Sequence, residues 1–274
     1  MNREVNFISK FIDVIKQNSN GALDGVSDIV ILAMAIVSIL LVIASIVAFV
    51  VSIFLCISYI KYNRTKNSCF KTGEQVARAI LDKNGLEHIK VSKNGSILFG
   101  NSYSHFFKKV RLRRLIWQKD SITSLAMATQ KSSLAVMDKE GDADMKRRIR
   151  LTPIIYFGPL AFIPMIIIGV ILDIIIFKTE TGLFTIGLTV LGLLFYILAF
   201  IMSVSLLKTE KKAQQKALEL MKVDCLATDE EIDMCAKLFK LYNIEYINNM
   251  VIALLELVYR ILQIIAYMQN SKNK

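Results

Sequence analysis

The hydrophobic residues of this chain gather into a few long runs, and polar residues fill the stretches between them. The first run, Ile29 to Ile60, contains no charged residue. As a helix it would extend about 48 Å, more than a hydrocarbon core of about 30 Å. Because it is too long for a signal peptide and lacks a small-residue cleavage pattern, the sequence predicts a retained signal anchor.

Two later runs predict an antiparallel pair of membrane helices. They cover Ile154 to Phe177 and Gly182 to Leu207, and only Lys178 to Thr181 separates them. A connection of this length leaves room for a tight turn and little else. A fourth run, Met250 to Met268, contains two charged residues and is a weaker candidate for a span.

Shorter amphipathic patterns lie outside these runs. They predict helices at Asn2 to Gln17 and Thr72 to Asn84, and strands at His88 to Val91, Ser96 to Phe99 and Lys108 to Leu112. We also expect a charged helix at Thr209 to Lys222 and a helix at Ser121 to Met137. Lys93 to Gly95 reads as the turn of a hairpin, and Asp138 to Asp144 as a solvated turn. The fold class is therefore a mainly α membrane protein with a small cytosolic α+β unit.

Charge indicates the orientation of the chain. The protein has 274 residues, 54% of them hydrophobic, and a formal net charge of +11. Residues 61 to 153 contain 20 Lys or Arg against 8 Asp or Glu, which places this loop in the cytoplasm by the positive-inside rule. We expect a plasma-membrane protein of a bacterium, with its N-terminus outside.

The same charge predicts which partners the chain contacts. Two basic clusters, Lys108 to Arg114 and Lys146 to Arg150, flank membrane segments. We expect them to contact anionic lipid head groups of the bilayer. Nucleic acid is not an expected partner, because no recognition motif or aromatic platform accompanies the cations.

Several motifs resemble those of one protein family. Lys71 to Leu86 reads KTGEQVARAILDKNGL, and a strand at Lys109 and the helix at Ser121 follow. These features resemble the membrane zinc metallopeptidases of the YugP type. The resemblance implies a zincin-like fold for the α+β unit, zinc in the active relatives, and an HEVGH motif that falls on Gln130 to Leu134.

The zinc-binding chemistry is missing from that motif. An HExxH helix presents two imidazoles on one face to hold zinc, and its glutamate polarises the metal-bound water. Here Gln130, Lys131 and Leu134 occupy those three positions. The resemblance also places the third ligand of the family at Glu210. We therefore expect no catalytic residue, no bound metal and no cofactor, with Glu210 as a residual ligand match.

These observations favour a catalytically inactive homologue that acts as a membrane-anchored scaffold or interaction protein for an unknown protein partner. One alternative is a zinc-dependent endopeptidase with non-standard ligands, for which His88 or His105 would have to reach Glu210. Another is a small transporter or channel subunit, suggested by Asp173 in the second span. In the inactive case, we expect the ammonium of Lys131 to replace the metal ion and pair with Glu210.

The expected organisation has five parts. They are an N-terminal amphipathic extension (1–28), a transmembrane signal anchor (29–60), a cytosolic zincin-like α+β region (61–153), a transmembrane hairpin (154–207) and C-terminal helices in the cytosol or at the membrane (208–274).

Overall fold

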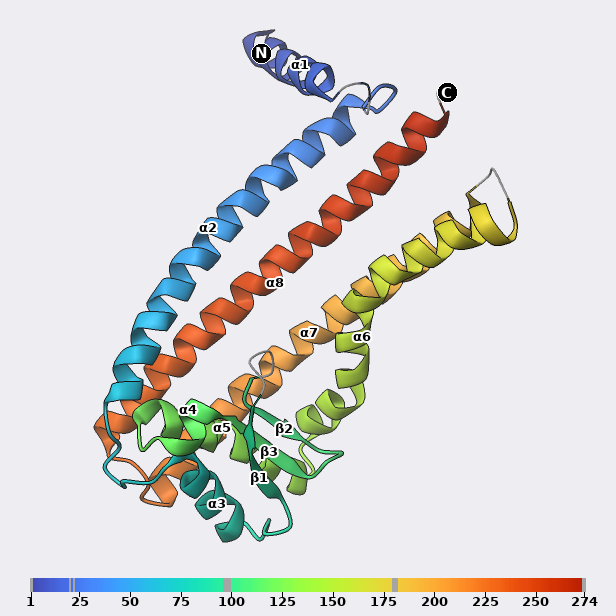
Figure 1. Cartoon of the computed structure of the whole chain (residues 1–274). Coiled ribbons are helices and arrows are strands. Elements are labelled where there is room, and N and C mark those ends of the chain that lie inside the picture. The colour runs from blue at the N-terminus through green and yellow to red at the C-terminus, as the bar shows by residue number, and fades with distance from the viewer. Residues whose placement is uncertain (1, 20, 22, 96–99, 179–181, 273–274) are drawn as a thin grey trace. The chain divides into compact units, whose positions relative to one another are not determined.

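The computed structural model describes residues 2–19, 21, 23–95, 100–178 and 182–272 (Figure 1). The helices are α1 (Asn2–Asn18), α2 (Asp28–Arg64), α3 (Gly73–Lys83), α4 (Arg114–Gln118), α5 (Ile122–Lys139), α6 (Ala143–Ile171), the π-helical turn η1 (Leu172–Ile176), α7 (Leu183–Val223) and α8 (Asp229–Lys272). The strands are β1 (Lys90–Asn94), β2 (Ser102–Ser104) and β3 (Lys109–Arg113). The strand expected at Ser96 to Phe99 lies outside the described residues.

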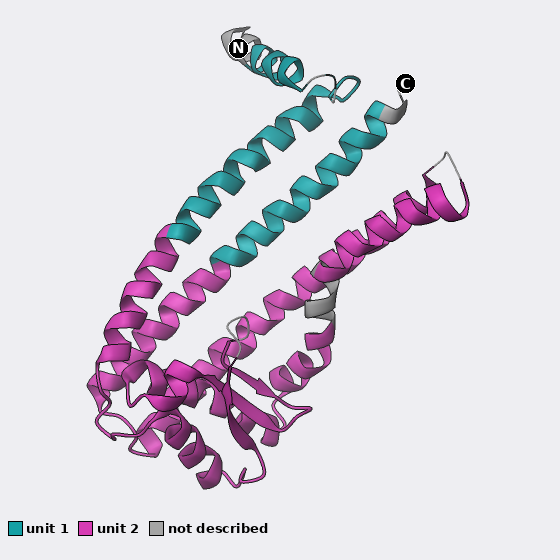
Figure 2. Cartoon of the chain, in the orientation of Figure 1, with its two compact units in different colours: residues 1–49, 248–274 teal, residues 50–247 magenta. Residues whose placement is uncertain are grey.

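The chain divides into two compact units (Figure 2). Unit 1 contains residues 1–49 and 248–274, and unit 2 contains residues 50–247. In unit 1, the predicted amphipathic helix is present as α1, and its Ile12 packs with Val26, Ile31 and Ala266 in a small apolar cluster. Unit 2 holds the sheet, α3 to α7 and the candidate site.

Three of the described helices are long and apolar enough to cross a membrane, namely α2, α7 and α8. The runs at 29–60 and 182–207 are thus confirmed as helices. The run at 250–268, the weaker candidate in the sequence, belongs to α8, which is also long and apolar enough to cross a membrane. The run at 154–177 is not a separate helix, because α6 already begins at Ala143 within the polar region; its apolar described part is Leu160–Ile176.

The end of α6 and the start of α7 pack closely. A Cβ built on Gly169 would lie 2.6 Å from the Cα of Thr185, so the two backbones meet where only glycine fits. Asp173 is buried in η1 and accepts hydrogen bonds from the backbone N–H groups of Phe184 (3.1 Å) and Thr185 (2.7 Å). Its carboxylate therefore caps the first turn of α7.

The three-stranded sheet has the order β1-β3-β2, with β1 parallel to β3 and β2 antiparallel to it. The predicted strand at Lys108 to Leu112 is confirmed as β3. The predicted hairpin turn at Lys93 to Gly95 is wrong, because Lys93 and Asn94 belong to β1 and pair with Leu112 and Arg113. The parallel partner of β1 is β3, which comes after β2 in the sequence. A local turn motif can indicate only the antiparallel pairing of consecutive strands.

The core of unit 2 is built around α5. Every side chain from Ile122 to Met137 is buried except Lys131. Helix α5 contacts α3, α4, the sheet and α7. The predicted helix at Thr72 to Asn84 is present as α3, where Thr72 and Gln75 form a capping box and Val76 and Ile80 are fully buried.

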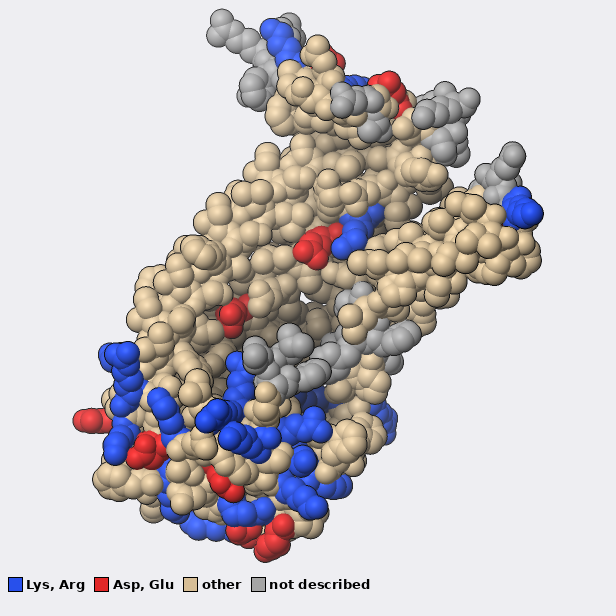
Figure 3. Space-filling model, in the orientation of Figure 1, with Lys and Arg blue, Asp and Glu red and all other residues tan. Residues whose placement is uncertain are grey.

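Two boundaries differ from the sequence prediction. The charged segment at Thr209 to Lys222 is not a separate helix, because α7 runs unbroken from Leu183 to Val223. Only the middle of the segment Asp138 to Asp144 is a turn. Helix α5 continues to Lys139, and the side chain of Asp142 caps the start of α6. Lys and Arg side chains gather on the part of unit 2 built from the sheet and the short helices (Figure 3).

Candidate functional site

Helix α5 positions Gln130, Lys131 and Leu134, the three residues that the resemblance aligns with a zinc-binding motif. The hydroxyl of Ser121 caps the helix by accepting a hydrogen bond from Ser124 N at 3.1 Å. Two turns further on, Gln130 and Leu134 are four residues apart and share one helix face with Lys131. Gln130 is 5% exposed and Leu134 is fully buried.

Glu210 of α7 lies directly opposite this face. Its Oε2 accepts a hydrogen bond from Gln130 Nε2 at 2.8 Å and another from Lys131 Nζ at 3.1 Å. Its Oε1 accepts from the Nη1 of Arg148 on α6. One carboxylate therefore joins three helices, and the structure brings Gln130, Lys131, Arg148 and Glu210 into contact.

The charge balance at Glu210 is set by the two cations. The side chains of Lys131, Arg148 and Glu210 are only 12%, 19% and 19% exposed. Burial alone would raise the pKa of Glu210, but the charges and hydrogen bonds of Lys131 and Arg148 outweigh it and lower that pKa to about 2. The carboxylate is ionised at neutral pH, and the group carries one excess positive charge.

Neighbouring contacts fix α5 and α6 against α7. The hydroxyl of Ser133 donates to the backbone carbonyl of Ala213 at 2.7 Å. Lysines at four-residue spacing along α7 pair with acidic residues in the turn between α5 and α6 and in the first turn of α6. These ion pairs are Lys208 with Asp144, Lys212 with Asp142, and Lys216 with Glu140.

Arg148 is the site residue that the sequence did not identify. It was placed with the basic cluster Lys146 to Arg150 and expected at lipid head groups, but its guanidinium points to Glu210. No signal in the sequence separates it from its neighbours, since four of those five residues are cationic. Its contact with Glu210 follows only from the packing of α6 against α7.

The residues at this position do not fit zinc. The side chain of Leu134 has no lone pair, and the Lys131 ammonium already binds the one carboxylate of the group. A dication beside Lys131 and Arg148 would be repelled by both. Among the described residues, no set of three or more His, Cys, Asp or Glu side chains is arranged to hold a metal ion.

The two histidines take other roles. His88 is exposed, while Nδ1 of His105 lies 2.6 Å from Oδ2 of Asp138. The same oxygen accepts from the hydroxyl of Tyr103 at 2.6 Å. Burial, together with this carboxylate, raises the pKa of Tyr103 well above its usual value. This cluster ties the sheet to the end of α5.

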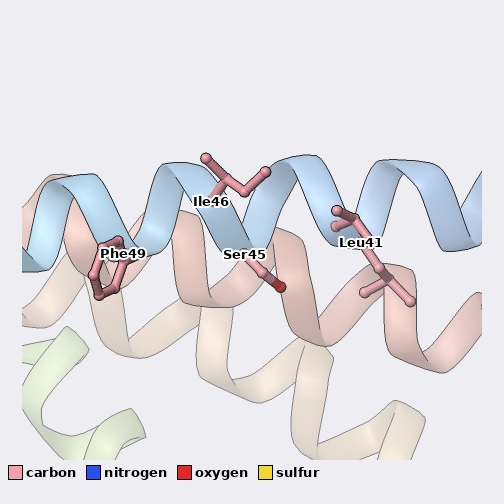
Figure 4. Close-up of a pocket in the computed structure, with 5 residues that line it drawn as sticks. Leu41, Ser45, Ile46 and Phe49 are labelled. Carbon is pink, nitrogen blue, oxygen red and sulfur yellow. The ribbon is translucent and has the colours of Figure 1, made fainter.

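A pocket on α2 belongs to unit 1, whereas Glu210 belongs to unit 2. It is lined by Leu41, Val42, Ser45, Ile46 and Phe49 (Figure 4). Four of these side chains are apolar, and they lie in the middle of a run without charged residues. The pocket therefore offers hydrocarbon contacts and no acid, base or metal ligand.

Comparisons with known proteins agree on one family. The family model described as "Putative neutral zinc metallopeptidase" matches residues 37–265. The curated "Putative membrane protease YugP" of Bacillus subtilis (strain 168) is 23% identical over 201 residues, which cover 72% of this chain and 82% of that protein. No solved structure matches the chain at a comparable level.

Proposed function

We propose that this chain is a catalytically inactive member of its family. The chain belongs to the family described as putative neutral zinc metallopeptidases, and the proposal concerns only its loss of catalysis. In this proposal the protein is a membrane-anchored scaffold. It keeps the metallopeptidase framework and uses the surface of unit 2 to bind a protein partner.

The replacement of the metal by cations carries this proposal. Zinc catalysis needs lone-pair donors around the ion and a carboxylate that accepts a proton from the attacking water. This chain has Gln130, Lys131 and Leu134 at those positions. Lys131 Nζ lies 3.1 Å from Glu210 Oε2, and Arg148 holds the other carboxylate oxygen. The cations neutralise the carboxylate that a metal would otherwise bind.

The proposal includes a location and a fold. We place residues 61–153 in the cytoplasm, with residues 29–60 as a signal anchor in the plasma membrane, because cations concentrate in that loop. We assign a degenerate zincin-like arrangement to unit 2. In its support, α5 and α7 bring Gln130, Lys131 and Glu210 into contact, where a zincin would bind its ion.

The proposed loss of catalysis is tested with the full chain in lipid nanodiscs. The purified protein is incubated with an unfolded protein substrate and a peptide mixture, with added zinc and with a chelator. We expect no cleavage above the background of a matched preparation of Glu210→Gln. Cleavage that the chelator abolishes and that Glu210→Gln also removes would contradict the proposal.

A further inference from the structure

Two pairs of cations in the basic cluster Lys108 to Arg114 lie at opposite ends of strand β3, with Arg111 between them. Lys108 and Lys109 lie where the strand begins, and Arg113 and Arg114 follow where it ends. Four residue steps along a strand cover about 13 Å. The two groups therefore face different surroundings, although they are adjacent in the sequence.

The arginine group lies beside the end of the membrane helix α2. Helix α4, which begins at Arg114, is followed by Asp120 and Ser121, and these two residues bond to the end of α2 and the loop after it: Ser121 Oγ donates to Asn63 Oδ1 at 3.2 Å, and the carbonyl of Asp120 accepts from Asn67 N at 2.8 Å. The start of α5 is tied to the same end of α2, because Thr123 Oγ1 donates to the carbonyl of Tyr59 at 3.3 Å. Tyr59 is the penultimate residue of the uncharged run, and the cations Lys61 and Arg64 follow in the last turn of α2, so we place this end of α2 at the head groups.

The lysine group lies at the opposite end of α5. His105, three residues before Lys108, bonds to Asp138 in the last turn of α5. Asp138 is 15 residues beyond Thr123, which corresponds to about 22 Å along a helix. Lys108 and Lys109 are thus well separated from the end of α2 that Arg113 approaches.

The surface around the arginines has the composition of a membrane interface. Arg113, Arg114 and Leu115 are exposed, and the exposed fraction of Leu115 is 54%. Behind them, Ile116 is fully buried and Trp117 packs partly buried on the core of unit 2. Partly buried Tyr59, Tyr62 and Tyr242 pack against the same core. Tyr and Trp concentrate at the head-group level of membrane proteins.

We propose that Arg113 and Arg114, with Leu115 between the lipid chains, form a binding site for the head group of an anionic phospholipid. The guanidinium groups bind the phosphate through charged hydrogen bonds, and the leucine side chain enters the apolar layer beneath it. The site is independent of the proposed loss of catalysis. Arg148 of the second basic cluster is not part of this site, because its guanidinium pairs with Glu210.

Trp117 allows a direct test, because it is the single tryptophan of the chain. The full protein is placed in nanodiscs that contain phosphatidylcholine and a small equal fraction of either brominated phosphatidylglycerol or brominated phosphatidylcholine. Bromine quenches tryptophan fluorescence only at short range. Two cations at an anionic surface should enrich the anionic lipid on the order of tenfold, so the brominated phosphatidylglycerol should quench Trp117 much more strongly.

Two variants with equal loss of charge identify the site. Arg113→Gln with Arg114→Gln should abolish the preference for brominated phosphatidylglycerol, whereas Lys108→Gln with Lys109→Gln should leave it unchanged. The unfolding temperature in detergent confirms that both variants are folded. Equal quenching by the two lipids in the unaltered protein would overturn the proposal, as would equal loss of preference in both variants.

Discussion

Replacing Glu210 by alanine should destabilise the protein more than any other single change at the site. The substitution leaves Lys131 and Arg148 close together, both mostly buried, and it leaves no carboxylate to neutralise them. Removing one partner of a buried ion pair costs about 3–5 kcal/mol. The lowering of the Glu210 pKa from 4.5 to about 2 gives a similar figure, about 3 kcal/mol at neutral pH.

The assay is thermal unfolding of the full chain in detergent, followed by circular dichroism. For a chain of this size about 3 kcal/mol should lower the unfolding temperature by roughly 6–12 °C. The matched control is Glu219→Ala, because Glu219 is exposed on the same helix. Its loss should change the free energy of unfolding by less than about 0.5 kcal/mol.

A second variant separates the charge effect from the loss of side-chain packing. Lys131→Met and Arg148→Met added to Glu210→Ala remove both uncompensated cations, and part of the lost stability should return. If the three side chains pointed into water, the pairs would be worth about 0–1 kcal/mol. Glu210→Ala would then unfold at the temperature of Glu219→Ala, and the reasoning would be refuted.

Three further outcomes follow from the same structure. Because the pKa of Glu210 is lowered to about 2, its contribution to stability should be complete above about pH 4.5 and disappear as the pH falls towards 2; acid unfolding of Glu210→Gln should lack this component. Gly169→Ala should disrupt the packing of α6 on α7, because its Cβ would lie 2.6 Å from Thr185 Cα, whereas Gly187→Ala meets nothing within 4 Å and should unfold like the unaltered chain. Asp173→Ala should cost about 1–2 kcal/mol through loss of the α7 cap, measured as a lower unfolding temperature in detergent.

Part of the site could be predicted from the sequence because the family motifs fix the register of α5 and α7. That register alone placed Lys131 opposite Glu210, and the structure has them 3.1 Å apart. Arg148 could not be predicted in the same way. It belongs to a helix for which the motifs supply no position, and its contact depends on how α6 packs against α7.

The fold shows the same distinction between local and distant information. The long apolar runs and the amphipathic spacing at Thr72 to Asn84 are local patterns, and they predicted α2, α3 and the apolar part of α7. The parallel pairing of Lys90 with Lys109 joins residues 19 apart, and no local pattern encodes it. The change from apolar to charged residues near Lys208 suggested a boundary, but helical hydrogen bonding continues through it.

The most direct test of the central claim is zinc binding by the full chain, measured by equilibrium dialysis and elemental analysis. The unaltered protein is compared with a variant that carries Gln130→His, Lys131→Glu, Leu134→His and Arg148→Gln, which restores the donors and frees Glu210. The account predicts far less than one zinc ion per unaltered chain and clear zinc binding by the restored variant. One tightly bound zinc ion per unaltered chain, lost on Glu210→Gln, would contradict it.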